Sequence, residues 1–368
     1  MVTLLSRTLL VMVMAATSLL VTGFGPPSLV ESGSRETAVT PSTLKQIRLS
    51  RPPALAARAA VLMDAASGQL LLNKDAHYRR AMASTTKIMT ALVALENARL
   101  DEVVITSRNV VVEPTIMGLT PGDRVTVEQL LYGLLLPSGN DAAVALAEHV
   151  GGSVLGFTAK MNDRAASLGL KDTHFSNPNG LDEEGHYSSA YDLAVMTREA
   201  LRNPIFEKIV ATPEARVKGP DSWSFKNNNQ LLQSYWGADG VKTGFTDNAG
   251  RCLVFSATRD GRRGISVVLD SPAMWEDSSA LLDHYFASFD RAVLAGVSVP
   301  LAVNSATLLV PVESSPVSVA FPSWQRQHLR WYLSPKPDPS AADMPAGTLA
   351  YYLFGSKVAE LPMKEGAN

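Results

Sequence analysis

The order of strand-like and helix-like segments across residues 58–297 limits the folds open to this chain more than any other feature. Two apolar runs on either side of Gly68 predict a β-hairpin at the start of this region. Two further strand-like runs, joined at Asp260 and Gly261, predict a second hairpin near its end, and the patterns between the hairpins are helical. The sequence therefore predicts a mixed α/β domain of the α+β type, with one antiparallel sheet assembled from both ends and a helical insertion.

The segments that flank this region differ from it in composition. Residues 1–25 hold a single charged residue, Arg7, and then an apolar run, a pattern typical of a signal peptide or of a retained membrane anchor. Residues 26–57 are rich in Pro, Ser and Thr and predict a flexible linker; residues 298–368 predict a small β-rich domain. Whether residues 1–25 are a signal peptide or a retained membrane anchor, the folded part is expected outside the cytoplasmic membrane, in the periplasm, in the cell wall or secreted.

Composition excludes several classes of function. The 368 residues carry a net charge of -2 without a dense run of Lys or Arg, so a nucleic-acid partner is not expected. The six histidines show no metal-ligand spacing, and we expect neither a metal nor an organic cofactor. Cys252 is the only cysteine, which rules out an intramolecular disulfide, and its strand-like surroundings predict a small buried hydrophobe.

Ser84 and Lys87 open a long apolar helical pattern in the stretch MASTTKIMTALVALE. Residues three apart in a helix share one face, so the lysine amine can reach the serine hydroxyl. Both residue types are also ordinary at a helix start, where Ser caps the first turn and Lys is a good helix former. A catalytic meaning therefore depends on partners elsewhere in the chain.

Two further motifs supply such partners. Ser138 and Asn140 form an S-x-N element where Pro and Gly interrupt two helical patterns, and Lys242, Thr243 and Gly244 form K-T-G in a strand-like run. The elements S-x-x-K, S-x-N and K-T-G resemble the signature of penicillin-binding proteins and class A β-lactamases. Three motifs in order, on a helix start, an interhelical loop and a strand, are far more specific than any one alone.

The chemistry of acyl transfer explains why these residue types are needed. A serine hydroxyl is a weak nucleophile, and Lys87 can serve as its base only if burial or a nearby cation lowers the pKa of the amine. Lys242 would supply that cation and would also attract a substrate carboxylate. The backbone N–H groups of Ser84 and Phe245 are expected to meet a developing oxyanion.

The remaining motif residues have expected roles around the same centre. Ser138 would relay a proton towards the leaving group. Asn140 would hydrogen-bond both Lys87 and an amide of the substrate. Gly244 would let its strand approach the substrate backbone closely.

The chain resembles the low-molecular-mass D-alanyl-D-alanine carboxypeptidases, penicillin-binding proteins of serine peptidase family S11, in the stretches ASTTKIMTALVALE, LLPSGNDAAVALAEHVGG, MNDRAASLGLKDTHFSNPNGLDEEGHYSSAYDLA and GVKTGFTDNAGRCLVFSATRDGRR. The similarity covers roughly residues 58–295 and implies a β-lactamase/DD-peptidase-like fold. It also implies that Ser84 is acylated and that Lys87 is the general base. Lys242 and Thr243 would bind the substrate carboxylate.

The resemblance implies a substrate as well, the terminal D-alanine of peptidoglycan stem pentapeptides, with β-lactam antibiotics as covalent inhibitors. Two alternatives stay open. A class A β-lactamase deacylates through a glutamate-activated water, and Glu183 and Glu184 lie in the right segment for one. A non-catalytic wall-binding protein could keep the fold, although the intact motifs argue against it. His186 and Asp192 are interpreted as structural residues.

Overall fold

The computed structural model describes residues 51–219, 222–294, 299–300, 308–311, 317–323, 329–335, 347–353 and 356–365. The signal peptide or anchor predicted for residues 1–25, and residues 26–50 of the linker predicted for residues 26–57, lie outside these ranges. Within them, no single helix is long and apolar enough to cross a membrane. The helices Asn140–Gly151 and Val154–Ser167 pass that test only as a pair, and the pair is bent by 83°.

A five-stranded antiparallel sheet brings together the two ends of the first domain, in the strand order β2-β1-β9-β8-β7. The strands are β1 (Ala59–Asp64), β2 (Leu70–Lys74), β7 (Ala238–Thr246), β8 (Gly250–Arg259) and β9 (Arg262–Leu269). β1 pairs with β9, from Ala59 opposite Leu269 to Asp64 opposite Gly264. The predicted sheet built from both ends of the domain is confirmed, and both predicted hairpins, β1–β2 and β8–β9, are present.

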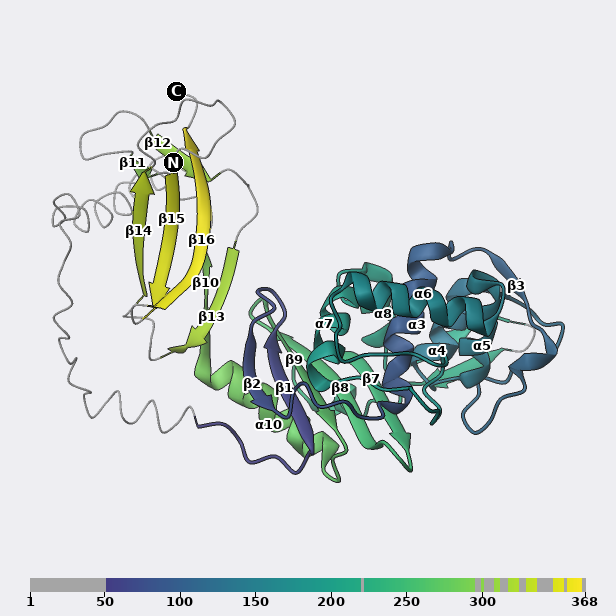
Figure 1. The fold of residues 1–368 in the computed structure, drawn as a ribbon. Coiled ribbons are helices and arrows are strands. Elements are labelled where there is room, and N and C mark those ends of the chain that lie inside the picture. The colour runs from purple at the N-terminus through teal and green to yellow at the C-terminus, as the bar shows by residue number, and fades with distance from the viewer. Residues whose placement is uncertain are drawn as a thin grey trace, which may run out of the picture. The chain divides into compact units, whose positions relative to one another are not determined.

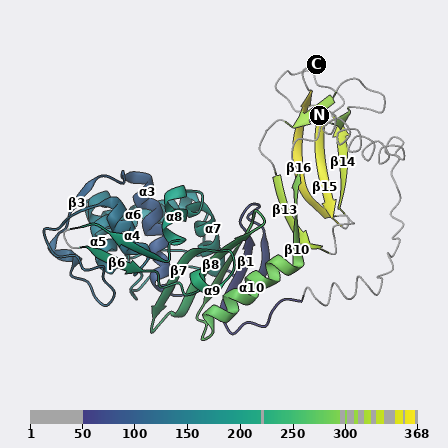
Figure 2. The same ribbon diagram turned by 180° about the vertical axis from the view of Figure 1, so that it is seen from behind.

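This sheet is covered on both faces, and its strands divide their side chains between two cores. In β1, Val61 and Met63 belong to one core while Ala60 and Leu62 belong to the other. Successive side chains of a strand point to opposite faces, so a strand that is apolar at every position needs cover on both sides. Figures 1 and 2 show α10 (Met274–Ser288) along one face, with the α-helices of residues 87–210 (α3, α4, α5, α6, α7 and α8) on the opposite side.

The middle of the domain is helical, as the sequence predicts. Its elements are η1 (Ala83–Thr86), α3 (Lys87–Asn97), η2 (Arg108–Val110), α4 (Val127–Leu135), α5 (Asn140–Gly151), α6 (Val154–Ser167), α7 (Ala190–Ala200), α8 (Pro204–Val210) and α9 (Leu231–Ser234), with the short strand pairs β3 (Val103–Ile105) and β4 (Arg124–Thr126), and β5 (Glu214–Val217) and β6 (Trp223–Lys226). Local signals set several boundaries. Thr126 forms a capping box with Gln129 at the start of α4. The break between α4 and α5 contains Pro137 and Gly139, as expected.

The C-terminal part of the chain is β-rich, which confirms that prediction of fold class. A second five-stranded sheet has the order β11-β12-β16-β15-β14. Its strands are β11 (Val299–Pro300), β12 (Leu308–Pro311), β14 (Leu329–Pro335), β15 (Gly347–Leu353) and β16 (Ser356–Glu365). Separately, β10 (Phe289–Leu294) pairs with β13 (Val317–Pro322). Every candidate site residue precedes β8, so the site belongs to the first sheet and its helices.

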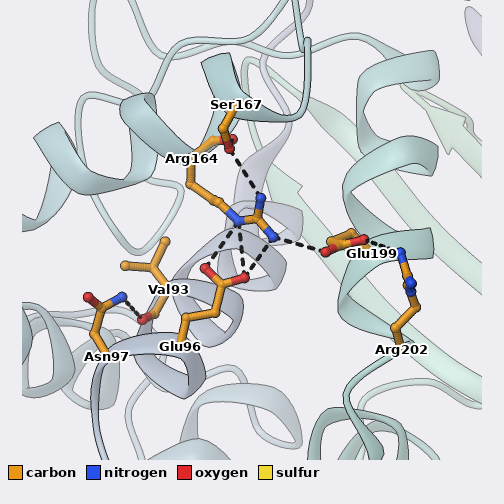
Figure 3. Close-up of polar contacts among 7 residues, drawn as sticks. All are labelled: Val93, Glu96, Asn97, Arg164, Ser167, Glu199 and Arg202. Atoms are coloured by element: carbon orange, nitrogen blue, oxygen red, sulfur yellow. Dashed lines mark hydrogen bonds and ion pairs between the residues drawn. The ribbon is translucent and has the colours of Figure 1, made fainter. Parts of the chain in front are cut away.

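An ion-pair network ties α6 to the C-terminal ends of α3 and α7 (Figure 3). Arg164 of α6 lies 2.8 Å from Glu96 of α3 and 2.9 Å from Glu199 of α7, and it also donates to Ser167. A carboxylate in the last turn of a helix opposes the helix dipole. The Arg164 guanidinium therefore offsets two such unfavourable charges. It also holds the C-terminal end of α3, the helix that follows Ser84.

We expect Arg164→Ala to lower the free energy of unfolding by about 2 kcal/mol, because charge-assisted hydrogen bonds to two carboxylates are lost together. Arg202→Ala is the matched control: it removes the 3.3 Å pair with Glu199, but the Arg202 side chain is 76% exposed. Exposed pairs contribute below about 1 kcal/mol. Urea unfolding of the two variants checks this, and equal losses would contradict a special role for Arg164.

Candidate active site

Ser84 lies on the 3₁₀ turn η1, directly before α3. The sequence predicted that Lys87, one turn later, would face it, and the two side chains do meet: Lys87 Nζ donates to Ser84 Oγ at 2.9 Å. In a 3₁₀ turn the side chains of residues three apart are nearly eclipsed, which favours this contact more than an α-helical turn would. The first two candidate residues therefore form one unit.

The turn that presents Ser84 is enclosed by two glycines from distant segments. A Cβ atom at Gly180 would lie 2.0 Å from the carbonyl oxygen of Ala83, and a Cβ at Gly244 would lie 3.0 Å from the Ser84 nitrogen. The first position excludes any side chain, and the second tolerates one only if the turn moves. Gly244 packs closely against the turn of Ser84, and the close approach of its strand to a substrate stays a prediction.

Lys87 is fully buried, and its amine is surrounded by oxygen atoms. Besides Ser84 Oγ, Nζ contacts Asn140 Oδ1 at 2.8 Å and the backbone carbonyl of Asn179 at 2.6 Å. Burial is the main reason why the pKa of Lys87 lies well below its usual value, and the nearby Lys242 lowers that pKa further. Asp141 acts in the opposite direction. The lowered pKa that the sequence analysis required of a lysine base is present.

Ser138 and Asn140 lie at the break between α4 and α5. Ser138 has a φ of +72°, a left-handed conformation that non-glycine residues rarely adopt. Its Oγ is buried and, among the residues that the structure describes, has no hydrogen-bond partner. Because buried hydroxyls are almost always paired, this combination of strain and an unpaired hydroxyl is typical of a functional position.

The K-T-G residues lie on β7, at the edge of the sheet. Lys242 is buried, and burial lowers its pKa to about 7; its Nζ donates to the carbonyl of Thr243 at 2.9 Å. The residue Phe245 is 63% exposed. The positive charge of Lys242 lowers the pKa of Lys87, so the residues of these two motifs interact electrostatically. The proposed oxyanion contact of the Phe245 N–H stays a prediction.

Sequence reasoning missed the contribution of the loop between α6 and α7, residues 168–189. Its backbone supplies the Asn179 carbonyl to Lys87, and its geometry is held by Asn177, which accepts from the Gly180 N–H at 2.8 Å. The stretch NPNG was a usable signal, because an Asn side chain commonly closes such a turn. Nothing in the sequence indicates which carbonyl faces the lysine.

Three side chains hold the backbone around the loop of Ser138; Asp141 and Asn229 are buried, and Asn228 is exposed. The Asp141 carboxylate accepts the backbone N–H groups of residues 117, 118 and 119 at 2.8–3.0 Å. Two asparagines that follow β6 reach both motifs. Asn228 donates to the carbonyl of Pro137 at 3.2 Å. Asn229 donates at 2.9 Å to the carbonyl of Gly240, two residues before Lys242. The run of asparagines at 227–229 was the available signal for this connection.

Asp192, Cys252 and His186, to which the sequence analysis gives no catalytic role, are all buried. Asp192 is buried and accepts from the Asp172 N–H and the Thr173 hydroxyl, both at 2.8 Å, while burial raises its pKa. Cys252 is buried, and burial raises its pKa to about 12. His186 Nε2 lies 2.8 Å from the Thr86 hydroxyl.

The chain is similar to known proteins over the residues that form this site. A family model described as D-alanyl-D-alanine carboxypeptidase (Peptidase S11) matches residues 46–273. D-alanyl-D-alanine carboxypeptidase DacF of Bacillus subtilis is 40% identical over 245 residues, 64% of this chain and 63% of that protein, so the chain spans less than two thirds of DacF. The D-alanyl-D-alanine carboxypeptidase of Streptomyces sp. strain K15 is 40% identical over 260 residues, 64% of this chain and 89% of that protein.

Solved structures give the same picture of the fold. The crystal structure of the Streptomyces K15 DD-transpeptidase is similar with a TM-score of 0.61 at 40% identity, covering 64% of this chain and 99% of that one. D-alanyl-D-alanine carboxypeptidase DacD from Francisella tularensis is similar with a TM-score of 0.70 at 28% identity, covering 87% of this chain and 95% of that one. The predicted DD-peptidase-like fold is confirmed.

Proposed function

The chain belongs to the Peptidase S11 family of D-alanyl-D-alanine carboxypeptidases, and from that premise we propose that it is an exported enzyme that removes the terminal D-alanine of peptidoglycan stem pentapeptides. Residues 1–25 would direct export or anchor the chain. The observation that carries the proposal is the 2.9 Å contact between Ser84 Oγ and the buried amine of Lys87. A desolvated amine beside a serine hydroxyl is an activated nucleophile pair.

The three oxygen neighbours of Lys87 favour a base role for its neutral form. A neutral amine has two N–H bonds and one lone pair. The Asn140 Oδ1 atom and the Asn179 carbonyl can only accept, so they take the two hydrogens. The lone pair is then left for the third neighbour, the Ser84 hydroxyl. In the neutral form the 2.9 Å hydrogen bond from Lys87 Nζ to Ser84 Oγ therefore reverses, and the hydroxyl becomes the donor.

The proposed reaction proceeds through an acyl-enzyme. Ser84 Oγ attacks the carbonyl carbon of the penultimate D-alanine as Lys87 takes the hydroxyl proton. The N–H groups of Ser84 and Phe245 stabilise the oxyanion. Ser138 passes the proton to the nitrogen of the leaving D-alanine, and the C–N bond breaks. Water then hydrolyses the Ser84 ester and restores both side chains; no cofactor takes part.

The same contacts weigh against a class A β-lactamase. That mechanism needs a glutamate that activates a water for rapid deacylation. The Glu183 carboxylate instead accepts a hydrogen bond from the Asn177 side chain at 2.9 Å, within its own loop. Glu184 accepts from the Ser176 hydroxyl through its backbone carbonyl, at 3.0 Å. Slow loss of a penicilloyl group and hydrolysis of peptides are therefore expected.

The test of the proposal is release of D-alanine from an acyl-peptide that ends in D-Ala-D-Ala, compared with the same peptide ending in an amide. Lys242 as a cation should bind the free carboxylate, a charge-assisted hydrogen bond that contributes about 1.5–3 kcal/mol, so the acid should react at least tenfold faster. Lys242→Ala should lose most of this preference. No D-alanine release from the acid would reject the carboxypeptidase.

The pH profile separates two roles of Lys242. Burial lowers its pKa to about 7, so above that pH the free enzyme loses the cation, and kcat/KM should fall for the acid but not for the amide. A Lys242→Ala variant that slows acid and amide by one factor would contradict carboxylate binding. In that case only the effect of Lys242 on the pKa of Lys87 would survive.

A further inference from the structure

His186 is a buried histidine that the proposed reaction does not use, yet it reaches the turn of Ser84 through a single side chain. Its Nε2 atom lies 2.8 Å from the hydroxyl of Thr86, and that hydroxyl lies 2.8 Å from the carbonyl oxygen of Ala83. Ala83 directly precedes Ser84. The loop between α6 and α7 is thus connected to the nucleophile turn by two consecutive hydrogen bonds.

The groups at the two ends of this chain of hydrogen bonds, the Ser176 N–H and the Ala83 carbonyl, fix the direction of both bonds. The backbone N–H of Ser176 donates to His186 Nδ1 at 3.0 Å, so Nδ1 carries no proton. Burial lowers the pKa of His186 to about 4, and the neutral ring therefore carries its proton on Nε2 and donates it to Thr86. The Thr86 hydroxyl in turn donates to the Ala83 carbonyl, which can only accept.

The turn needs such support because its backbone is strained. Ala83 has a φ of +48°, a conformation that costs a residue with a Cβ atom about 1 kcal/mol or more. The backbone of Gly180 also packs closely against the Ala83 carbonyl, since a Cβ atom at that position would lie 2.0 Å from the oxygen. The Ala83 carbonyl is therefore held by two contacts, with Thr86 and with Gly180.

Fixing this carbonyl also fixes a neighbouring N–H. The Ala83 carbonyl and the Ser84 N–H belong to one planar trans peptide unit, so they point in opposite directions and turn together. The Ser84 nitrogen faces β7, where a Cβ at Gly244 would lie 3.0 Å away and where Phe245 follows. This N–H is the one that the proposed reaction uses for the oxyanion.

We propose that His186 is a positioning residue, which through Thr86 holds the Ala83–Ser84 peptide so that the Ser84 N–H points at the oxyanion. This inference rests on the proposed acyl transfer at Ser84. It makes the loop between α6 and α7 a part of the catalytic apparatus in two ways, by the Asn179 carbonyl on Lys87 and by His186 on the oxyanion donor.

The test uses two matched pairs of variants in the full chain. His186→Gln can keep a donor near the place of Nε2, whereas His186→Asn keeps an acceptor near Nδ1 but cannot reach Thr86. Thr86→Ser keeps the hydroxyl, and Thr86→Val removes it at nearly constant volume. Stopped-flow acylation by a fluorescent penicillin gives both the rate constant and the fraction of molecules that react.

His186→Asn and Thr86→Val should each slow acylation by about 10–100-fold at an unchanged reacting fraction, somewhat less than outright loss of an oxyanion donor. His186→Gln and Thr86→Ser should recover most of the rate. The double variant should be no slower than either single one, because both break one chain of hydrogen bonds.

Other outcomes identify what is wrong. If the parent chain is not acylated, the proposed function fails, and the positioning role fails with it. Two outcomes would overturn the positioning role alone, provided that the parent reacts. In the first, the variants react at the parent's rate constant but in a smaller fraction of molecules. In the second, the rate losses of the two single variants multiply in the double variant. Should His186→Asn not fold, the comparison of Thr86→Val with Thr86→Ser decides.

Discussion

Benzylpenicillin is expected to add one covalent group per chain, on Ser84, and Ser84→Ala is expected to take up none. The reason is geometric: in the part of the chain that the structure describes, Ser84 is the serine whose hydroxyl contacts the buried Lys87 amine. Intact-mass measurement gives the number of groups added, and peptide mapping locates them. The loss of labelling in Ser84→Ala should be complete, because no other group can form the ester at that position.

Ser138→Ala is the matched control for this experiment. Its hydroxyl is buried and unpaired among the described residues, so its loss should slow acylation without moving the adduct from Ser84. An adduct mapped to Ser138, or labelling of Ser84→Ala, would contradict the assignment. The adduct on the parent chain should also persist through many peptide turnovers, and its rapid loss without peptide cleavage would favour a β-lactamase.

Replacement of Lys87 is expected to slow acylation at least about a hundredfold, the scale for loss of a positioned base. Lys87→Met keeps an unbranched side chain of similar length in this buried place, so the fold should persist. Lys87→Arg keeps a cation that cannot lose its proton. If Lys87 acts as a base, both variants should be equally slow; if it acts only through its charge, the arginine variant should retain activity.

The pH dependence gives an independent check on the same residue. Burial and the Lys242 cation lower the pKa of Lys87, so the neutral, reactive amine is present above that pKa and is lost as the pH falls through it. With the peptide amide, which does not need the Lys242 cation, the acylation rate of the parent should therefore rise with pH to a plateau. In Lys87→Met this rise should disappear, and a profile that keeps it would assign the titration to another group.

Much of the fold could be predicted because its signals are local. Apolar runs around Gly68 and around Asp260 gave the two hairpins, and Pro137 gave the break between α4 and α5. Turn residues and hydrophobic period act over a few neighbouring positions, so they can be read without knowledge of the rest of the chain. The order of these segments then left few ways to build a single sheet.

The contact between Ser84 and Lys87 was predictable for the same reason, since three residues separate the two side chains. The link from Lys87 to Asn140 was expected from motif chemistry, although 53 residues separate them. The approach of Gly244 to a substrate stays a prediction. In this structure, the neighbour of Gly244 is the turn of Ser84.

By itself, the sequence determined which side chains carry the chemistry: a hydroxyl, two amines and an amide at Ser84, Lys87, Lys242 and Asn140. Tertiary structure alone decided the surroundings of these side chains: their burial, their backbone hydrogen-bond partners and the conformation of the turn that carries Ser84. Burial of both lysines, the Asn179 carbonyl on Lys87 and the strained Ala83 turn all arise between segments far apart in the chain. Backbone carbonyls are the same in every residue and desolvation depends on the whole packed core, so no local pattern could specify either of them.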